Sequence, residues 1–319
     1  METLDAIAGN FLPVAKQVGI LFALMSVGFV CRRARLVDEA AVKGMVNLLV
    51  LFVTPCLIVE CFQRPCDATK LKSLGTAFAF ATAAHVALIA AASALYRRTP
   101  PDTRCVLRLA TVFSNAGFMG IPLEHALFGD EGVFYGIAYV VVFNIFIWSW
   151  GYGVMRGCRW PLDAKQVATI CVNPGTVGLA IALPLFLLSV RLPPVVAAPV
   201  SMMASMNTPL AMVVIGFYLG GAKLGAVASS GGAWFAAALR LVAFPLAAVA
   251  VFAALGGRVD RTMALASVTA SAAPAAAMVS MLASKFNRDI DASVGVVSGT
   301  TLLSILTMPL VIAIAMAVL

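Results

Sequence analysis

The chain has 319 residues, of which 62% are hydrophobic and 11% are charged, and its mean hydropathy is +1.00. Soluble domains are about one quarter charged, so this composition excludes a soluble globular protein. Apolar runs of about 20 residues, the length of a membrane-crossing helix, recur along the chain. Because these runs are continuous rather than alternating, they also exclude a β-barrel. The net charge of +8 does not indicate a nucleic-acid partner, since the basic residues gather in short connections between the runs.

Ten apolar segments predict ten transmembrane helices. The connections between them are too short to hold a separate soluble domain. The sequence therefore predicts an all-α polytopic membrane protein. The predicted spans are 11–31, 43–62, 73–96, 106–127, 133–155, 166–190, 195–220, 234–255, 262–284 and 290–317.

The distribution of Lys and Arg predicts how these helices are oriented. Fourteen basic residues lie in or near the connections after odd-numbered spans, and six lie in or near those after even-numbered spans. Basic connections stay in the cytoplasm, so both termini are predicted on the non-cytoplasmic side of the cell inner (plasma) membrane. The fourteen are Arg32, Arg33, Arg35, Lys43, Arg97, Arg98, Arg104, Arg108, Arg156, Arg159, Lys165, Lys223, Lys285 and Arg288; the six are Arg64, Lys70, Lys72, Arg191, Arg258 and Arg261.

The sequence contains no motif for catalysis or metal binding. No CxxC pair occurs and no histidine stands at ligand spacing, so we expect no metal, no cofactor and free thiols. A Walker motif, HExxH and a serine nucleophile with its base are also missing, which argues against an enzyme or an ATP-driven pump. The seven cysteines are Cys31, Cys56, Cys61, Cys66, Cys105, Cys158 and Cys171.

The two halves of the chain resemble each other at a nearly constant offset. The Thr-Pro pair at 54–55 returns 154 residues later at 208–209, and Ser114 corresponds to Ser271, 157 residues later. Each half holds five spans, an odd number, so the second half must enter the membrane from the opposite side. The sequence therefore predicts a 5+5 inverted repeat, an arrangement that recurs in secondary transporters.

Spans 4 and 9, at matching positions of the repeat, contain residues that disfavour an unbroken helix. SNAGFMGIPL begins at Ser114, and ASVTASAAPAAAMVS (266–280) surrounds Pro274. Broken backbone in hydrocarbon is tolerated only where it lines a cavity or is buried in protein. Helix N-termini exposed at such a break attract anions. We therefore predict two discontinuous crossover helices that form a binding site; proline kinks that serve only packing are the alternative.

The chain resembles the auxin efflux carrier family over essentially its whole length. The resemblance rests on SNAGFMGIPLEHALFG (114–129), VVFNIFIW (141–148), NPGTVGLAIAL (173–183), NTPLAMVVIGFYLGG (207–221) and ASAAPAAAMVSMLASKFNRD (270–289). That family includes bacterial malonate transporters and the plant PIN-type carriers. The resemblance implies a bile-acid-transporter-like fold with ten spans, an inverted repeat and two broken helices that cross.

The resemblance also implies a division into two domains. Spans 1, 2, 6 and 7 would form a scaffold from residues 1–62 and 159–222, and the other six spans a transport domain from residues 63–158 and 223–319. Family members commonly meet a second protomer through spans 2 and 7, which implies a homodimer. The GxxxG at 216–220 either seats that dimer or packs span 7 within its own protomer.

Three residues acquire roles from the resemblance. Asn115 matches an asparagine that contacts substrate, and Asn144 falls where the plant carriers have a glutamine lining the site; interhelical hydrogen bonding is the alternative for Asn144. His85 lies close to where the plant carriers keep a charged pair, but ATAAHVAL (81–88) departs from that pattern. The long cytoplasmic loop of many plant members is missing, so plant hormone transport is not expected.

Ionisable residues inside the spans are scarce. His85 is one, and histidine titrates in the pH range that proton coupling requires; a neutral core histidine is the alternative. Among the acidic residues only Glu60 and Glu124 fall inside spans, toward their outer ends. Because neither crossover core contains a carboxylate, an organic anion is favoured over a cation as the substrate.

These patterns predict a secondary active transporter of small organic anions, short mono- or dicarboxylates such as malonate, that works by elevator-type alternating access. A gated channel or a ligand sensor of the same fold is the alternative. The expected partners are the anion, membrane lipid, protons as a possible coupling ion and a second protomer. The predicted substrate-binding residues are Ser114, Asn115, Gly117, Gly120, Asn144, Ser271 and Pro274; Pro122, Pro55 and Pro209 are predicted to shape the helices, and His85 is the candidate for coupling.

The predicted orientation can be tested with tags. A tag fused to either terminus should react with a membrane-impermeant reagent in intact cells, because both ends are predicted outside. A tag inserted at 97–104, in a basic connection, should react only after permeabilisation. A terminal tag that stays protected in intact cells would contradict the orientation.

Overall fold

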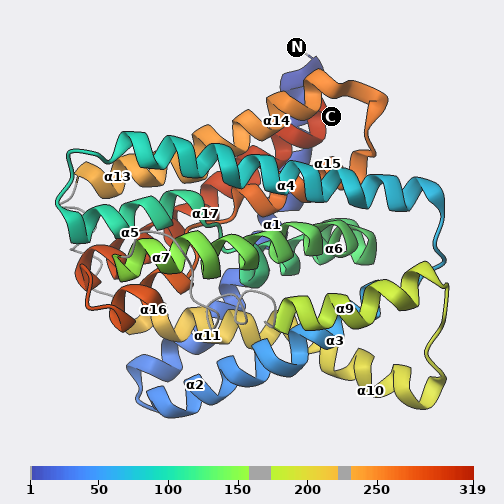
Figure 1. Cartoon of the computed structure of the whole chain (residues 1–319), viewed down its shortest axis with the longest axis horizontal. Helices are drawn as coiled ribbons and strands as arrows, with labels where there is room; N and C mark the ends of the chain where they lie inside the picture. The colour runs from blue at the N-terminus through green and yellow to red at the C-terminus, as the bar shows by residue number, and fades with distance from the viewer. Residues whose placement is uncertain (1, 158–173, 222–230) are drawn as a thin grey trace.

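The computed structural model describes residues 2–157, 174–221 and 231–319 (Figure 1). Within these ranges every regular secondary-structure element longer than an isolated bridge is a helix, so the all-helical architecture is confirmed. Seven helices of the described part are long and apolar enough to cross a membrane, as expected of a multi-pass protein. They are Leu4–Arg33, Glu39–Cys61, Ala68–Leu95, Ala116–Arg156, Pro194–Gly221, Gly231–Arg258 and Ile290–Val318.

Local features explain why seven helices stand against ten predicted spans. Ala116–Arg156 covers the end of span 4 and all of span 5, bending at Gly129 with a φ of 62°. Span 9 is divided into two helices that are each too short to cross. Span 6, predicted at 166–190, begins outside the described residues, and its described part is the shorter helix Gly175–Leu187. The total of ten stays a prediction.

The chain from Glu2 to Leu95 forms four helices, two of which are preceded by a capping aspartate. Asp38 accepts a hydrogen bond from the Ala41 amide and Asp67 from the Lys70 amide, both at 2.7 Å. These side chains satisfy amides that lack an acceptor within the helix and so fix where it starts. The helices are α1 (Glu2–Arg33), α2 (Glu39–Leu48), α3 (Thr54–Cys61) and α4 (Ala68–Leu95), with a π-helical turn, Leu49–Val53, between α2 and α3.

The remaining helices include two interruptions, after α5 and after α15. The segment to residue 157 contains α5 (Pro101–Val112), a π-helical turn (Ala116–Gly120), α6 (Ile121–Phe146), a second π-helical turn (Ile147–Gly151) and α7 (Tyr152–Arg156). The second half contains α9 (Pro174–Leu187), α10 (Pro194–Ser205), α11 (Asn207–Gly221), α13 (Gly231–Ala238), a π-helical turn (Leu239–Ala243), α14 (Phe244–Leu255), a 3-10 turn (Gly256–Arg258), α15 (Arg261–Ala272), α16 (Met278–Lys285) and α17 (Ile290–Val318).

The repeated Thr-Pro pairs both lie where a helix restarts. Pro55 is the second residue of α3, and Pro209 is the third residue of α11. Proline has no N–H, and the first turn of a helix does not need one. The Thr54 hydroxyl donates to the Leu49 carbonyl at 2.9 Å, which gives a carbonyl of the preceding turn a hydrogen-bond partner. The prolines therefore divide two membrane-length helices, Glu39–Cys61 and Pro194–Gly221, at corresponding places.

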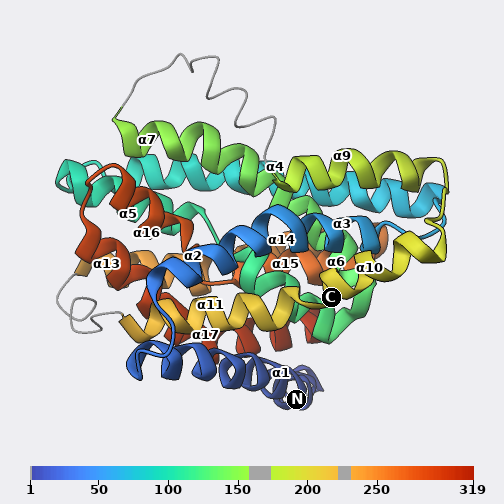
Figure 2. The same ribbon diagram turned by 90° about the horizontal axis from the view of Figure 1, so that it is seen from below.

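Helices far apart in the sequence gather into two sets. Figure 1 shows α2 and α3 beside α9, α10 and α11 along one side, with α4 to α7 and α13 to α17 above them. Direct packing of α3 on α9 and α10 holds the first set together, and α1 packs on α11 of this set. Packing of α6 on α4 and α15, and of α17 on α5, holds the second set together. Helix α1 also packs against α17 (Figure 2).

The GxxxG at 216–220 packs inside its own protomer. A β-carbon on Gly216 would overlap the Met25 carbonyl oxygen of α1, and one on Gly28 would overlap the Val213 carbonyl oxygen of α11. A β-carbon on Gly220 would lie 2.9 Å from the Arg32 β-carbon. Small residues are what allow two helix backbones to approach this closely. Of the two roles considered for this motif, the structure therefore supports packing of α11 against α1.

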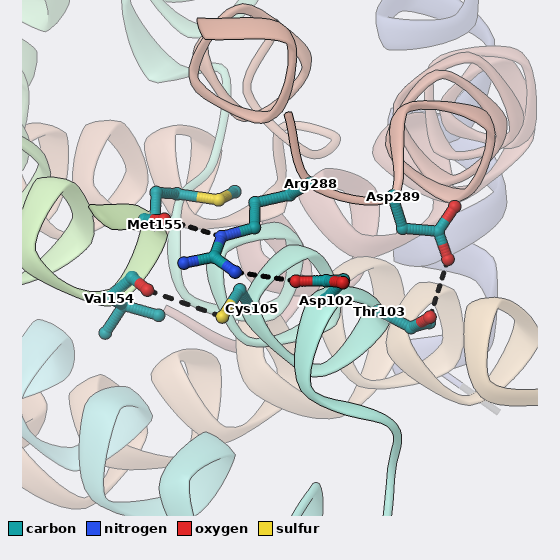
Figure 3. Close-up of polar contacts among 7 residues, drawn as sticks. All are labelled: Asp102, Thr103, Cys105, Val154, Met155, Arg288 and Asp289. Carbon is teal, nitrogen blue, oxygen red and sulfur yellow. Dashed lines mark hydrogen bonds and ion pairs between the residues drawn. The ribbon is translucent and has the colours of Figure 1, made fainter. Parts of the chain in front are cut away.

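A polar network joins three elements of the second set at one end of the molecule (Figure 3). Arg288, just before α17, donates to the Asp102 carboxylate at 2.6 Å and to the Met155 carbonyl at 2.7 Å. The Thr103 hydroxyl donates to the Asp289 carboxylate at 2.6 Å. The network thus ties α5, α7 and the start of α17 to one another.

The α1–α11 contact predicts a large difference between two glycine substitutions. Gly216→Val should lower the free energy of unfolding by about 1–3 kcal/mol or more, because the new side chain overlaps the backbone of α1. Gly19→Val on α1 is the matched control, since a β-carbon there meets no atom within 4 Å. Thermal unfolding of the two variants in detergent measures the difference; equal melting temperatures would contradict the assigned contact.

Candidate functional site

The two interrupted segments meet where their helices stop. Phe113, after α5, is extended with φ −99° and ψ 110°, and Ala273, after α15, is extended with φ −62° and ψ 147°. Ser114 and Ala275 pair as an isolated antiparallel β-bridge. The two chains therefore cross in extended conformation between helix ends, at the positions where the sequence predicts the breaks.

Hydrogen bonds across the crossing satisfy the backbone groups that the broken helices leave free. The Asn115 amide donates to the Pro274 carbonyl at 2.7 Å, and the Ala276 amide donates to the Phe113 carbonyl at 2.9 Å. The Thr300 hydroxyl of α17 accepts from the Ala275 amide at 3.2 Å. A buried backbone group without a hydrogen-bond partner costs free energy. Because these bonds provide the partners, both helices can be interrupted inside a membrane.

A cavity of about 290 Å³ opens beside the crossing. One wall comes from α2, α3 and the first residues of α9 and α11, and the other from the crossing, α6 and α16, so the cavity lies between the two sets of helices. Its described lining carries no charged side chain and is mostly apolar. The polar lining residues are Asn47, Thr54, Ser114, Asn115, Asn144, Trp148 and Asn207.

Two helix beginnings face this cavity. The π-helical turn that leads into α6 starts at Ala116, and Gly117 and Phe118 line the cavity; α16 starts at Met278, which lines it together with Ala277. The first amides of a helix have no acceptor within it and carry a partial positive charge. An uncharged cavity that collects two such ends favours a negatively charged guest.

Two polar side chains of the crossing are available to a guest. The Ser114 side chain is fully buried, and its hydroxyl has no hydrogen-bond partner among the described residues. Asn115 is 7% exposed and lines the cavity, while its carbonyl accepts from the Met119 and Gly120 amides at 2.9 and 3.2 Å. The backbone of Asn115 is thereby fixed, and no described residue binds its side-chain amide. That amide can donate to a carboxylate.

Asn144 lines the cavity from the opposite end of α6. Its amide donates to the Val140 carbonyl one turn earlier at 2.8 Å. This bond lies within one helix, so within the described chain the interhelical bond considered as the alternative is not what holds the side chain. The remaining donor and the carbonyl oxygen of the Asn144 amide stay available to the cavity.

Three residues predicted to bind substrate lie outside the described lining. Gly120 faces α15, where its β-carbon would lie 3.5 Å from the Ala270 α-carbon. Ser271 donates its hydroxyl to the Val268 carbonyl at 2.8 Å, and Pro274 accepts from the Asn115 amide. Each of the three shapes the crossing through backbone contacts. The helix-shaping residue Pro122 lies in the first turn of α6, where a proline is tolerated.

Arg240 is a residue that the sequence reasoning overlooked. It lies in the π-helical turn between α13 and α14 and is fully buried behind the crossing. Its guanidinium donates to the Thr111, Val112 and Ser271 carbonyls. A hydrogen bond with a charged group contributes about 1.5–3 kcal/mol, so this side chain is a major structural element. The available signal was a lone arginine within an apolar run, since ionisable groups inside membranes usually have a function.

His85 lies behind the crossing and does not line the cavity. It is fully buried on α4, with its ring 5.0, 5.5 and 6.0 Å from the rings of Tyr139, Phe146 and Phe113. Its Nδ1 is 2.8 Å from the Ala81 carbonyl oxygen, which assigns the donor role to Nδ1. Nε2 then accepts, and it has no partner among the described residues.

Glu124 is a third buried ionisable group near the crossing, after Arg240 and His85. The sequence predicts only that it lies toward the outer end of its span; the structure adds that it is fully buried in the first turn of α6. Neither carboxyl oxygen has a hydrogen-bond partner in the described part of the chain. A β-carbon on Gly136 would overlap this carboxyl group, so the missing side chain there makes the room for it.

Asn47 and Asn207 are cavity residues that the sequence reasoning also missed. Asn47 comes from α2, and Asn207 is 3% exposed at the start of α11, directly before the second Thr-Pro pair. The signal was present, because both asparagines stand alone in apolar surroundings close to repeat-related prolines. Which of the many lone polar residues would face one cavity became visible only from the packing.

Comparison with known proteins gives one family match. A protein-family profile described as a membrane transport protein matches residues 13–312. A search of curated proteins finds no match.

Proposed function

The chain belongs to the membrane transport protein family, which includes the auxin efflux carriers, and on that premise we propose that it is a secondary active transporter of small organic anions. The observation that carries this proposal is the cavity beside the crossing. It has no charge in its described lining, and it brings the beginnings of two helices together with Ser114 and Asn115. Helix N-termini and an amide are a suitable set of donors for a carboxylate.

The proposed architecture is a 5+5 inverted repeat of ten spans with two crossover helices. Spans 4 and 9 would be the crossover helices, and the bridge between Ser114 and Ala275 supports this assignment. The Thr-Pro pairs at corresponding helix restarts support the repeat. The proposed boundaries at 158/159 and 222/223 lie outside the described residues.

An elevator-type movement is the proposed mechanism. The first set of helices, with α1, would be the scaffold of residues 1–62 and 159–222, and the second set the transport domain of residues 63–158 and 223–319. A cavity between the two sets would change its exposure as one set slides past the other. The Arg288 network supports movement of the transport domain as a unit, because it links α5, α7 and α17.

The size and polarity of the cavity support short mono- or dicarboxylates, with malonate as the representative substrate. A volume of about 290 Å³ suits a small organic acid, and the apolar majority of the lining suits its carbon atoms. Asn115 and Asn144 both line the cavity, so each side-chain amide can donate to one carboxylate of a dicarboxylate. Saturable uptake with counterflow would distinguish this carrier from a gated channel or a sensor.

We further propose a homodimer in the plasma membrane with both termini outside. Leu51 and Phe52 between α2 and α3, and Val195 and Met202 on α10, are exposed large apolar residues that support an apolar contact or a lipid-facing surface in the membrane. Because the glycines of α11 are occupied by α1, the dimer contact would use these other residues of spans 2 and 7.

Protons are the proposed coupling ion, with His85 as the residue that carries them. The buried Nε2 has no partner in the described chain and can accept a proton, and the ring contacts Phe113 of the crossing. A neutral core histidine is the competing explanation, which the bond to the Ala81 carbonyl and the aromatic contacts also fit.

Binding of anions can be measured as thermal stabilisation of the purified protein. Malonate should raise the melting temperature with concentration, equivalent to about 2.7 kcal/mol when its concentration is about 100 times Kd. Asn115→Ala should weaken binding about tenfold or more, because a donor to a charged group is lost. Asn10→Ala on α1, which does not line the cavity, should bind as the wild type does. If acetate, malonate and succinate all leave the wild type unchanged, the anion proposal is wrong.

The coupling proposal predicts a specific loss in His85→Gln. Glutamine is polar and of similar size but cannot take up a proton, so the transport rate of this variant should stop following pH between about 5 and 8. Uptake of labelled malonate into vesicles across that range measures the effect. Glu124→Gln is the comparison, since it removes the buried carboxyl group near the crossing. A pH profile unchanged in shape in His85→Gln would assign His85 to packing.

A further inference from the structure

Arg240 contacts both interrupted helices at the ends opposite the cavity. Its Nη1 donates to the Thr111 and Val112 carbonyls at 3.3 and 3.1 Å, and its Nη2 donates to the Ser271 carbonyl. Thr111 and Val112 are the last two residues of α5, and Ser271 is the penultimate residue of α15. One guanidinium group therefore bridges the C-terminal ends of two helices that come from opposite halves of the chain.

A cation would stabilise these two helix ends. The last carbonyls of a helix have no intrahelical donor and carry a partial negative charge. Two such ends brought together and buried would repel each other and leave acceptors unsatisfied. A guanidinium group satisfies both needs, because its planar fork offers five donors and it stays protonated inside proteins.

The positive charge of Arg240 has no carboxylate partner in the described part of the chain, although its side chain is fully buried. A full positive charge is thus fixed in the second set of helices. It lies on the other side of the crossing from the cavity that the two helix beginnings line.

We propose that Arg240 is a built-in cation of the crossing, a positioning residue that does the work of a bound metal ion. It holds the ends of α5 and α15 together, and its charge balances the carboxylate on the other side of the crossing. Anion binding then needs no sodium ion. This second consequence rests on the proposed function, whereas the first concerns the crossing itself.

The competing explanation is that Arg240 only fills space between α5, α15 and α14. Both explanations predict that Arg240→Ala is less stable, so loss of stability alone does not separate them. The two explanations differ in which added compound should restore the stability of Arg240→Ala. A vacated cation site should be refilled by free guanidinium but not by urea, which has nearly the same shape and no charge.

The test uses the full-length protein in detergent, with guanidinium chloride and urea far below denaturing concentrations. Guanidinium should raise the melting temperature of Arg240→Ala and urea should not, since only the cation binds the native variant. Arg108→Ala is the matched control, because Arg108 donates to the Ser93 carbonyl and not to the helix ends at the crossing. Equal effects of guanidinium and urea on Arg240→Ala, or an equal guanidinium rescue of Arg108→Ala, would overturn the proposal.

Malonate binding provides the second measurement. Arg240→Ala should bind malonate about tenfold more weakly or worse, with affinity recovered by guanidinium, and the wild type should bind equally well in sodium and in choline chloride. A sodium requirement in the wild type, or unchanged affinity in Arg240→Ala, would overturn the role in anion binding. If no acid binds the wild type, the proposed function fails, and the guanidinium rescue alone then decides whether Arg240 is the cation of the crossing.

A second pair of variants keeps the proposal testable if Arg240→Ala does not fold. Arg240→Lys keeps the charge, and Arg240→Gln keeps a donor without the charge. The lysine variant should be the more stable of the two and bind malonate at least about tenfold more tightly. Equal stability and equal affinity of the two variants would show that charge at this position is irrelevant.

Discussion

Two hydrogen bonds, from the Asn115 amide to the Pro274 carbonyl and from the Ala276 amide to the Phe113 carbonyl, hold the point at which both interrupted helices stop. In a membrane such breaks are possible only if the freed backbone groups find partners within the protein. The antiparallel pairing of Ser114 with Ala275 provides those partners. Small side chains allow the close approach, and proline at 274 removes a backbone N–H that the broken helix would otherwise leave without an acceptor.

This pairing sorts the four helix ends by polarity. The ends of α5 and α15, where carbonyls are exposed, turn toward the Arg240 guanidinium. The beginnings of α6 and α16, where amides are exposed, turn toward the cavity. A site of this kind can attract an anion although its described lining has no charged side chain, because the partial charges of the backbone and one cation behind them provide the field.

The packing of the helices explains why the cavity lies where it does. Close glycine contacts bind α1 to α11, and helix packing with the Arg288 network holds α5, α7 and α17 together. The cavity lies between the set that contains α2, α3, α9 and α11 and the set that contains the crossing, α6 and α16. This position explains why its lining comes from both halves of the chain.

Much of the fold followed from the sequence. The hydropathy predicted a multi-pass helical protein, the residues of SNAGFMGIPL and of the segment around Pro274 predicted two breaks, and Asn115 was recognised as a cavity residue. These features are local, since apolar length, proline and glycine act on the chain within a few residues.

Tertiary structure decided what depends on distant residues. It assigned the GxxxG at 216–220 to α1 and showed that Asn47 and Asn207 line the cavity, whereas Gly120, Ser271 and Pro274 lie at the crossing outside its described lining. It also gave Arg240 its partners, which lie 31 to 129 positions away in the chain. A lone arginine in an apolar run shows that a charge must be accommodated. Only the packing of α5, α15 and the π-helical turn shows which groups accommodate it.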